Sequence, residues 1–207
     1  MVRKPEISGI PDYQDLKNFS VASMVLALAF SAFYGDFTDI GRYPFFILGS
    51  ASVLFFRELG VRSAVNLLDG YVDLELAGDG CTTTLFGGIM AVVSGLPLIL
   101  LFPVYSSVSR KQYENWGKST DVIWALYKFK VAKWSVSGLF LGYIIFYSLG
   151  LNTLAQMTAL FTFFQMMPFD YSGIPTGPLD GAEIIRWSGF YWLTFTGLSI
   201  LAIAFTM

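Results

Sequence analysis

The sequence predicts an all-α integral membrane protein with about six transmembrane helices, a small strand-like surface loop and one re-entrant segment rich in proline and glycine. Hydrophobic residues make up 55% of the 207 residues, charged residues only 14%, and the mean hydropathy is +0.59. A soluble domain carries about a quarter charged residues. Apolar runs suited to a helical crossing of about 20 residues recur along the chain. Together these observations predict one polytopic membrane domain over residues 1–207.

Composition also excludes several classes of function. Thirteen Lys and Arg residues against fifteen Asp and Glu residues give a formal charge of −2, which is too balanced and too sparse for a nucleic-acid surface. The single cysteine, Cys81, allows neither an intramolecular disulfide nor a paired-cysteine zinc or redox site. The chain has no histidine, so the commonest metal ligand and the commonest general base are both missing. We therefore expect no metal and no cofactor.

Six apolar stretches are expected to cross the membrane as helices. They comprise residues 19–34, 43–56, 84–105, 134–150, 152–167 and 190–207. The third contains glycines and Pro97, which are tolerated in a membrane where neighbouring helices satisfy the freed backbone. The polar residues 1–18 lack a basic start and a small-residue cleavage site, so they do not resemble a signal peptide. We expect a multi-pass protein of the cell membrane.

Two segments between the expected spans carry most of the charge. Residues 57–83 are acidic, and the alternation from Tyr71 to Leu76 predicts a short strand, one arm of a hairpin at the membrane surface. Residues 106–133 are basic and are expected to form an interfacial loop. Within it, an amphipathic helix over residues 122–131 would place Trp124 and Tyr127 at the level of the headgroups.

The orientation in the membrane follows from a small difference in charge. With six spans, the side holding residues 106–133 carries eight of the thirteen basic residues, and the side holding the amino terminus carries five. The positive-inside rule then places residues 106–133 in the cytoplasm and the amino terminus outside.

Polar residues enter the apolar sequence at two places, where they are costly and usually face a cavity or a partner. One is the end of the second expected span, residues 55–62, and the other is residues 164–187. Prolines at 168, 175 and 178 break the second stretch and make it re-entrant. In the alternative interpretation, each place is a charged membrane border with a loop that joins two spans.

Placed together, these segments resemble the site-2 protease family of membrane-embedded zinc metalloproteases, most closely its compact archaeal type. In that family a His-Glu-x-x-His motif closes one span, and a later Asn-x-x-Pro…Leu-Asp-Gly stretch supplies the third metal ligand. The matching runs are Arg57-Glu58-Leu59-Gly60-Val61, Gln165-Met166-Met167-Pro168 and Pro178-Leu179-Asp180-Gly181. The strand-like loop over residues 71–76 also agrees, so the resemblance covers nearly the whole chain.

The departures from the family motif imply that catalysis is lost. Zinc in such a site needs two imidazoles four residues apart on one helical face, and Arg57 and Val61 stand in their places. A guanidinium is always charged, offers only donors and repels a dication. Glu58 matches the general base, but it has no metal-activated water to deprotonate. Asp180 matches the third ligand, and Gln165 replaces the asparagine that helps to hold substrate.

The resemblance also implies that Arg57 and Asp180 are neighbours, because the matching positions in the family face one metal. We expect the guanidinium to lie where zinc would lie and to pair with Asp180, and with Glu58 as well, as a structural pin. In the alternative, Arg57 extends to the membrane interface and Asp180 caps the helix that runs to Trp187.

Two surfaces are candidates for binding a partner. The re-entrant segment would line a groove for an unwound partner segment, with contacts from Met166, Met167, Phe169 and Ile174. The other surface is the small-residue face formed by Gly138 and Gly142, which serves either internal helix packing or contact with another protein.

The function predicted from these features is that of a non-catalytic site-2-protease-like membrane protein. It would bind a transmembrane segment or another membrane protein, and lipid, as a chaperone, regulator or accessory subunit. The alternative is a structural subunit of a larger integral membrane complex. An active metalloprotease with unusual ligands and a small transporter or channel are minor alternatives. A transporter would show paired half-helices in two repeats, and the sequence has one broken segment.

Overall fold

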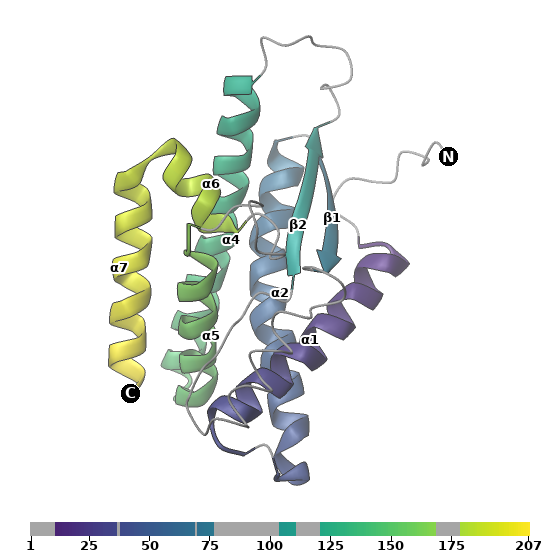
Figure 1. Ribbon diagram of the computed structural model, residues 1–207, viewed down its shortest axis with the longest axis vertical. Helices are drawn as coiled ribbons and strands as arrows, with labels where there is room; N and C mark the ends of the chain where they lie inside the picture. Colours follow the sequence, from purple (N-terminus) through teal and green to yellow (C-terminus); the bar gives the residue numbers. More distant parts are fainter. Residues whose placement is uncertain (1–10, 37, 69, 77–103, 111–120, 169–178) are drawn as a thin grey trace.

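The computed structural model of the chain describes residues 11–36, 38–68, 70–76, 104–110, 121–168 and 179–207. Most of the helices run lengthwise in a bundle, and a two-stranded sheet lies beside α1 and α2 (Figure 1). In chain order the elements are α1 (Tyr13–Phe33), the short 3-10 helix η1 (Ile40–Arg42), α2 (Tyr43–Leu67), β1 (Gly70–Leu76), β2 (Val104–Arg110), α4 (Asp121–Ser148), α5 (Asn152–Gln165), α6 (Asp180–Trp187) and α7 (Gly189–Thr206).

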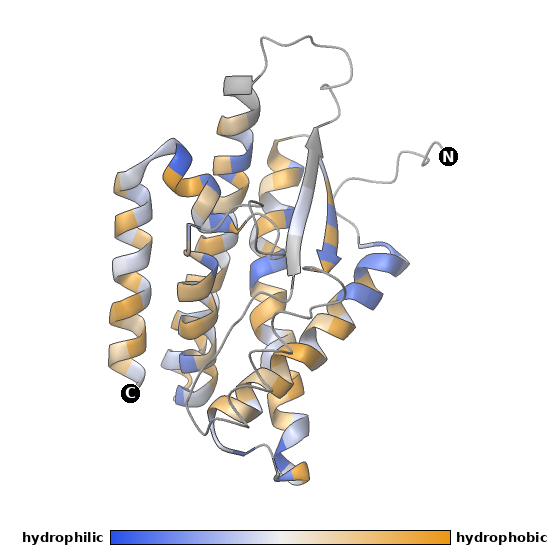
Figure 2. Cartoon of the chain, viewed as in Figure 1, coloured by the Kyte–Doolittle hydropathy of each residue, from blue (hydrophilic) through white to orange (hydrophobic). Residues whose placement is uncertain are grey.

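Within the described residues, four helices are long and apolar enough to cross a membrane. They are Tyr13–Phe33, Ile40–Leu67, Ala125–Ser148 and Gly189–Thr206. Figure 2 shows hydrophobic residues along most of the length of these helices. Helix α5 has 14 residues, fewer than the about 20 that a crossing needs. The prediction of a mostly helical protein with membrane-length apolar helices and a small strand element is confirmed, whereas six spans are not shown.

Local sequence explains where several helices begin and end. Asp12 and Asp15 form a capping box at the start of α1, in which the Asp15 N–H donates to Asp12 Oδ1 at 2.7 Å and the Asp12 N–H donates to Asp15 Oδ2 at 3.3 Å. Pro44 lies in the first turn of α2. Backbone N–H groups in the first turn have no acceptor within the helix, so proline costs no hydrogen bond there. Gly35 and Gly150 follow α1 and α4 with φ values of 73° and 71°, a left-handed conformation that favours glycine.

The strand predicted before Leu76 is confirmed as β1, and it pairs antiparallel with β2, from Gly70 opposite Arg110 to Leu76 opposite Val104. Residues 104–110 were expected to end the third span and to begin the basic loop, and both expectations are wrong. The hydropathy of these residues could not reveal the strand because its pairing depends on a distant segment. The rest of the third expected span lies outside the described residues.

Helices α2 and α4 continue well beyond the spans predicted for them. Helix α2 includes residues 57–67 of the expected acidic loop, and α4 includes residues 121–133 of the expected basic loop. Tyr127, expected at the level of the headgroups, is instead buried in a cluster with Val61 and Val72. The first half of α4 therefore packs on the protein, because α2 and β1 cover its apolar face.

The packing of α2 on α4 also corrects the predicted sidedness. Gly60 lies against Trp134, and Gly138 lies against Phe56, so the two helices are antiparallel. The end of α2, the start of α4 and the sheet consequently share one end of the bundle, which we call the sheet end; residues 34–43 lie at the other, the turn end (Figure 1). The sequence predicted one membrane crossing between α2 and α4, which would place these two helix ends on opposite sides of the membrane. The structure places them at the same end, so the predicted sidedness is wrong.

The amino-terminal region also lies at the sheet end, because Asp15 of α1 is bonded to Arg62 of α2 and to β1. The sequence placed this region and residues 106–133 on opposite sides of the membrane. The structure brings the start of α1 and the start of α4 to the same end.

Candidate functional site

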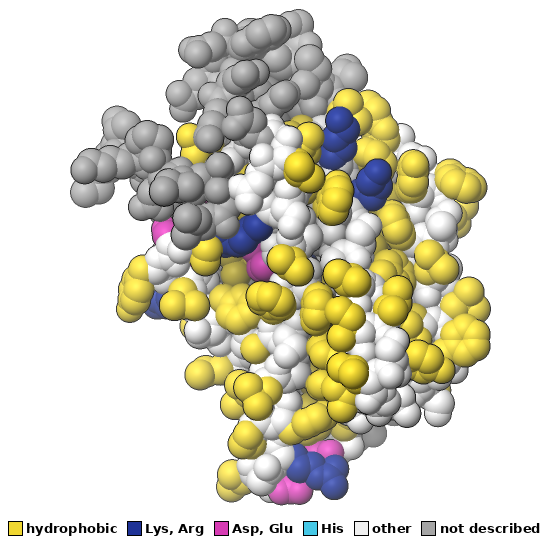
Figure 3. All heavy atoms as spheres, turned by 180° about the vertical axis from the view of Figure 1, so that it is seen from behind, with side chains coloured by type: hydrophobic (Ala, Val, Ile, Leu, Met, Phe, Trp, Pro, Cys, Tyr) yellow, Lys and Arg dark blue, Asp and Glu magenta, His cyan; other side chains and the backbone are white. Residues whose placement is uncertain are grey.

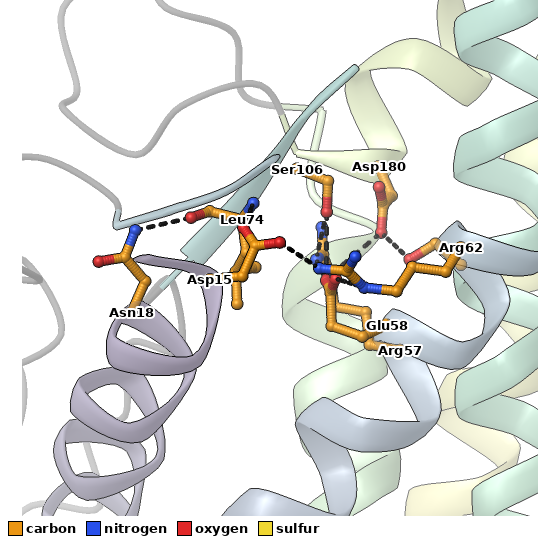
Figure 4. Close-up of polar contacts among 9 residues, drawn as sticks. Asp15, Asn18, Arg57, Glu58, Arg62, Leu74, Ser106 and Asp180 are labelled. Atoms are coloured by element: carbon orange, nitrogen blue, oxygen red, sulfur yellow. Dashed lines mark hydrogen bonds and ion pairs between the residues drawn. The ribbon is translucent and has the colours of Figure 1, made fainter. Parts of the chain in front are cut away.

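Five charged side chains of alternating sign lie in a row at the sheet end, mostly buried between the helices (Figure 4). In order they are Asp15, Arg62, Glu58, Arg57 and Asp180. We call this set the charge row. Its three carboxylates and two guanidiniums give a formal charge of −1. At this end of the bundle, charged side chains of α1, α2 and α6 therefore meet in one set of ion pairs.

Arg57 lies between Glu58 and Asp180 in the charge row, and its side chain is only 1% exposed. Its Nη1 donates to Glu58 Oε1 at 2.8 Å and to Ser106 Oγ of β2 at 2.8 Å. Its Nε lies 3.7 Å from Asp180 Oδ2, a distance that makes an ion pair rather than a hydrogen bond. The predicted proximity of Arg57 and Asp180 is therefore confirmed. The alternative in which Arg57 extends to the interface is wrong.

Asp180 is the first residue of α6, where a negative charge suits the helix dipole. Its Oδ2 accepts a hydrogen bond from Ser135 Oγ of α4 at 2.6 Å. The N-cap of α6 is Leu179, which forms no side-chain capping bond. The alternative in which Asp180 caps this helix is therefore wrong, because its carboxylate turns toward α2 and α4 instead.

The other half of the charge row ties α1 and β1 to α2. Arg62 Nη2 lies 2.8 Å from Asp15 Oδ2, and Arg62 Nε lies 3.5 Å from Glu58 Oε2. Asp15 Oδ1 also accepts from the Leu74 N–H at 2.8 Å, and Asn18 Nδ2 donates to the Leu74 carbonyl at 2.7 Å. Both backbone groups of one β1 residue are thus bound by α1, so the position of the sheet depends on this half of the row.

Close packing of α2 on α4 brings Ser135 beside α2. A Cβ atom on Gly60 would collide with the Trp134 carbonyl, and one on Gly138 would collide with the Phe56 carbonyl. Only glycine permits α2 and α4 to approach this closely. Gly142 lies against the Phe56 ring in the same interface. The face formed by Gly138 and Gly142 therefore packs inside the chain, which is the first of the two roles that the sequence left open.

A similar close approach holds α6 against the end of α5. A Cβ atom on Gly181 would collide with the Met166 carbonyl, and Trp192 Nε1 of α7 donates to that same carbonyl at 2.7 Å. This carbonyl belongs to the end of a helix, where intrahelical partners run out. Trp192 thus anchors the start of the broken stretch between α5 and α6, and with it the position of Asp180.

The remaining predicted residues lie close to these elements or outside the described residues. Val61 is fully buried one turn after Arg57 on α2. Gln165, at the end of α5, is 0% exposed, and neither atom of its amide has a hydrogen-bond partner among the described residues. The other predicted contacts are Met166, which is buried, Met167, which is half-buried, and Phe169 and Ile174, which are outside the described residues.

Sequence reasoning missed four side chains of the site: Asp15, Arg62, Ser106 and Ser135. Arg62 carried a usable signal, because it follows Glu58 by four residues and therefore shares its helical face. Ser135 lies a turn before Gly138, on the small-residue face already noted. Asp15 and Ser106 reach the site only through tertiary contacts, and no local pattern in the sequence marks them.

The geometry of the charge row does not fit zinc. Arg57 bridges the carboxylates of Glu58 and Asp180, and its fixed positive charge and lack of acceptors oppose a dication. Val61 offers no ligand atom at the other position. Among the described residues, no group of three or more His, Cys, Asp and Glu side chains is arranged to hold a metal. The arrangement provides ion pairs and hydrogen bonds that link α1, α2, β1, β2, α4 and α6.

No family model matches the chain, and neither a curated protein nor a solved structure matches it. The resemblance to site-2 proteases therefore depends on the short motifs around Arg57, Gln165 and Asp180. Of these, the first and the third meet in the charge row.

Proposed function

We propose that this chain is a non-catalytic membrane protein built on a site-2-protease-like plan, and that it binds a transmembrane segment or another membrane protein as a chaperone, regulator or accessory subunit. The observation that carries the proposal is the position of Arg57 between Glu58 and Asp180. By the resemblance, these three residues stand for a zinc ligand, the general base and a further ligand. A fixed cation at the first position keeps the other two paired, so the charge row takes the place of the metal.

Gln165 supports a binding function for the same region. A buried amide without a partner costs about 1–3 kcal/mol, and both amide atoms of Gln165 lack a hydrogen-bond partner among the described residues. An amide presents one acceptor and a pair of donor hydrogens, which complement the groups of a peptide backbone. Because Gln165 is 0% exposed, an unwound segment of a partner would satisfy both atoms only once the residues that cover the amide move aside.

Restoring the missing zinc ligands tests the first part of the proposal, that the chain is built on a site-2-protease-like plan. The wild-type protein is expected to purify with well under one zinc per chain. A variant with Arg57→His and Val61→His places two imidazoles on the face that Asp180 approaches. We expect about one zinc per chain by elemental analysis, lost when Asp180→Ala is added.

The matched control is Ser137→His with Leu141→His, which has the same spacing on an exposed face of α4. It supplies two imidazoles without a third ligand at hand. Equal zinc uptake by this control, or none by a folded Arg57→His and Val61→His variant, would contradict the site-2-protease-like plan.

Photo-crosslinking tests the binding half. Met167 is half-buried beside Gln165, whereas Leu141 is exposed on the outer face of α4. Gly142 is unsuitable because a larger side chain there would strike Phe56. We expect a crosslinker at Met167 to capture a membrane protein in native membranes. Capture from Leu141 alone, together with purification only as part of an assembly, would favour the alternative of a structural subunit.

A further inference from the structure

Basic and aromatic side chains occur together on the outer surface of the sheet end. Lys130 and Lys133 lie one turn apart on α4, with Trp134 next to them. Trp187 at the end of α6 and Tyr191 in the first turn of α7 complete the group, which we call the basic–aromatic patch. The three aromatic residues are 41–43% exposed. Figure 3 shows basic side chains set among hydrophobic ones toward this end of the molecule.

Ring contacts join Lys133, Tyr191 and Trp187 within the patch. Lys133 Nζ lies 5.7 Å from the centroid of the Tyr191 ring and 5.9 Å from that of Phe129. The Phe129 ring in turn stacks on Trp187 at 5.9 Å. A lysine above rings is attracted to their faces. Neither Lys130 nor Lys133 forms an ion pair with a described residue, so both charges remain available to an anion.

The height of the patch matches one face of a bilayer. Trp134 lies against Gly60, which follows Tyr43 by 17 residues of α2, or roughly 26 Å at 1.5 Å per residue. Lys130 lies about one further turn along α4. The lysines therefore stand roughly 27–32 Å from the start of α2, close to the hydrocarbon thickness of about 30 Å.

The surface between these two levels is apolar. Residues 134–151 and 187–207 contain no charged residue. Leu141 on α4 and Leu198 and Leu201 on α7 are among the exposed side chains there. The charged residues of α4 and α6 thus give way to an uncharged, apolar surface on α4 and α7, as expected where headgroups give way to acyl chains.

The charge of the two ends indicates which leaflet the patch meets. At the turn end, Arg42 is the one basic residue among those described, and it is paired with Asp36 at 2.7 Å and Asp39 at 3.4 Å. The sheet end carries Lys130 and Lys133, neither of which is paired with a residue in the described part of the chain. An excess of basic residues marks the cytoplasmic side, whose leaflet contains the anionic lipids.

We propose that the basic–aromatic patch binds the headgroup of an anionic phospholipid of the cytoplasmic leaflet. The phosphate lies between Lys130 and Lys133, each of which offers three N–H donors. The rings of Trp134, Trp187 and Tyr191 lie at the level of the glycerol backbone, and the acyl chains follow the apolar faces of α4 and α7. This site is separate from the charge row and does not depend on the function proposed for it.

Native mass spectrometry of the protein in a mild detergent tests the site, with phosphatidylglycerol and phosphatidylcholine added separately. We expect the wild-type protein to prefer phosphatidylglycerol. Lys130→Gln with Lys133→Gln should lower that affinity roughly 30-fold, because each basic residue near a membrane surface contributes about fivefold. Lys130→Arg with Lys133→Arg should retain the preference, because guanidinium also binds phosphate.

The matched control is Lys17→Gln with Arg42→Gln, which makes the same change in net charge away from the patch. It should bind phosphatidylglycerol as the wild-type protein does. Equal binding of the two lipids by the wild-type protein, full binding by the Lys130→Gln and Lys133→Gln variant, or an equal loss in the control would overturn the proposal.

Discussion

Two arginines of this protein each lie beside two carboxylates, yet their surroundings are opposite. Arg42, where α2 begins, is paired with Asp36 at 2.7 Å and Asp39 at 3.4 Å, and its side chain is 61% exposed. Arg57, between Glu58 and Asp180 in the charge row, has carboxylate oxygens at 2.8 and 3.7 Å and a side chain that is 1% exposed. The two sets of contacts are similar in number and length. Any difference in the free energy that is lost when a partner is removed must therefore come from exposure to solvent.

Water and salt screen the exposed cluster, so each of its charges keeps much of its hydration when a partner is removed. The buried charges have lost that hydration, and each depends on its neighbours for compensation. Breaking a buried pair by removing one partner is therefore strongly destabilising, although replacing the whole pair by apolar residues can be nearly neutral. The comparison suggests that the charge row fixes the arrangement of α2 and α6 more than it adds net stability.

Removal of the buried cation Arg57 should have the largest effect. Arg57→Met leaves the buried carboxylates of Glu58 and Asp180 without their shared partner. We expect a loss of about 3–5 kcal/mol in the free energy of unfolding, measured by denaturant titration in detergent with tryptophan fluorescence. A loss below about 1 kcal/mol would show that the charge row is not held in the way its burial implies.

Removal of both partners should recover part of that loss. We expect Arg57→Met combined with Asp180→Leu to be more stable than the sum of the single changes by about 2 kcal/mol, because residues in contact do not act independently. The measurement is a double-mutant cycle under the same denaturing conditions. Strict additivity would mean that Arg57 and Asp180 do not interact.

Loss of the serine that binds Asp180 should have a smaller effect. Ser135→Ala removes the hydroxyl that donates to Asp180 Oδ2 at 2.6 Å, a bond to a charged group that contributes about 1.5 kcal/mol. Ser137→Ala is the matched control, since the exposed Ser137 hydroxyl bonds only to the Lys133 carbonyl of its own helix, at 2.8 Å. Equal unfolding free energies for the two variants would show that the hydrogen bond from Ser135 to Asp180 does not stabilise the protein.

The smallest effect is expected at the exposed arginine. Arg42→Met breaks two ion pairs, as Arg57→Met does, but the carboxylates left behind remain in water. We expect no change in unfolding free energy beyond experimental error. A loss comparable with that of Arg57→Met would mean that the number of ion pairs, rather than their burial, determines the cost.

The candidate site could be predicted in part from the sequence. The motifs around Arg57 and Asp180 each match a short pattern of one family, so the sequence predicts that they belong to one site. In the structure, Arg57 Nε lies 3.7 Å from Asp180 Oδ2. Asp15 and Ser106 could not be predicted, because side chains from α1 and β2 enter the site only through packing. A hydroxyl or a carboxylate has no local signature that distinguishes a buried partner from a surface residue.

The sequence by itself determined the membrane character of the chain, the course of most helices and the strand before Leu76, since composition and residue periodicity act over neighbouring residues. Tertiary structure alone decided that residues 104–110 form a strand and that α1 and α4 begin at the same end. It also decided that Gly138 faces α2 rather than a partner. Strand pairing and helix packing join segments far apart in the chain, and their free energy depends on surfaces that exist only once the chain has folded.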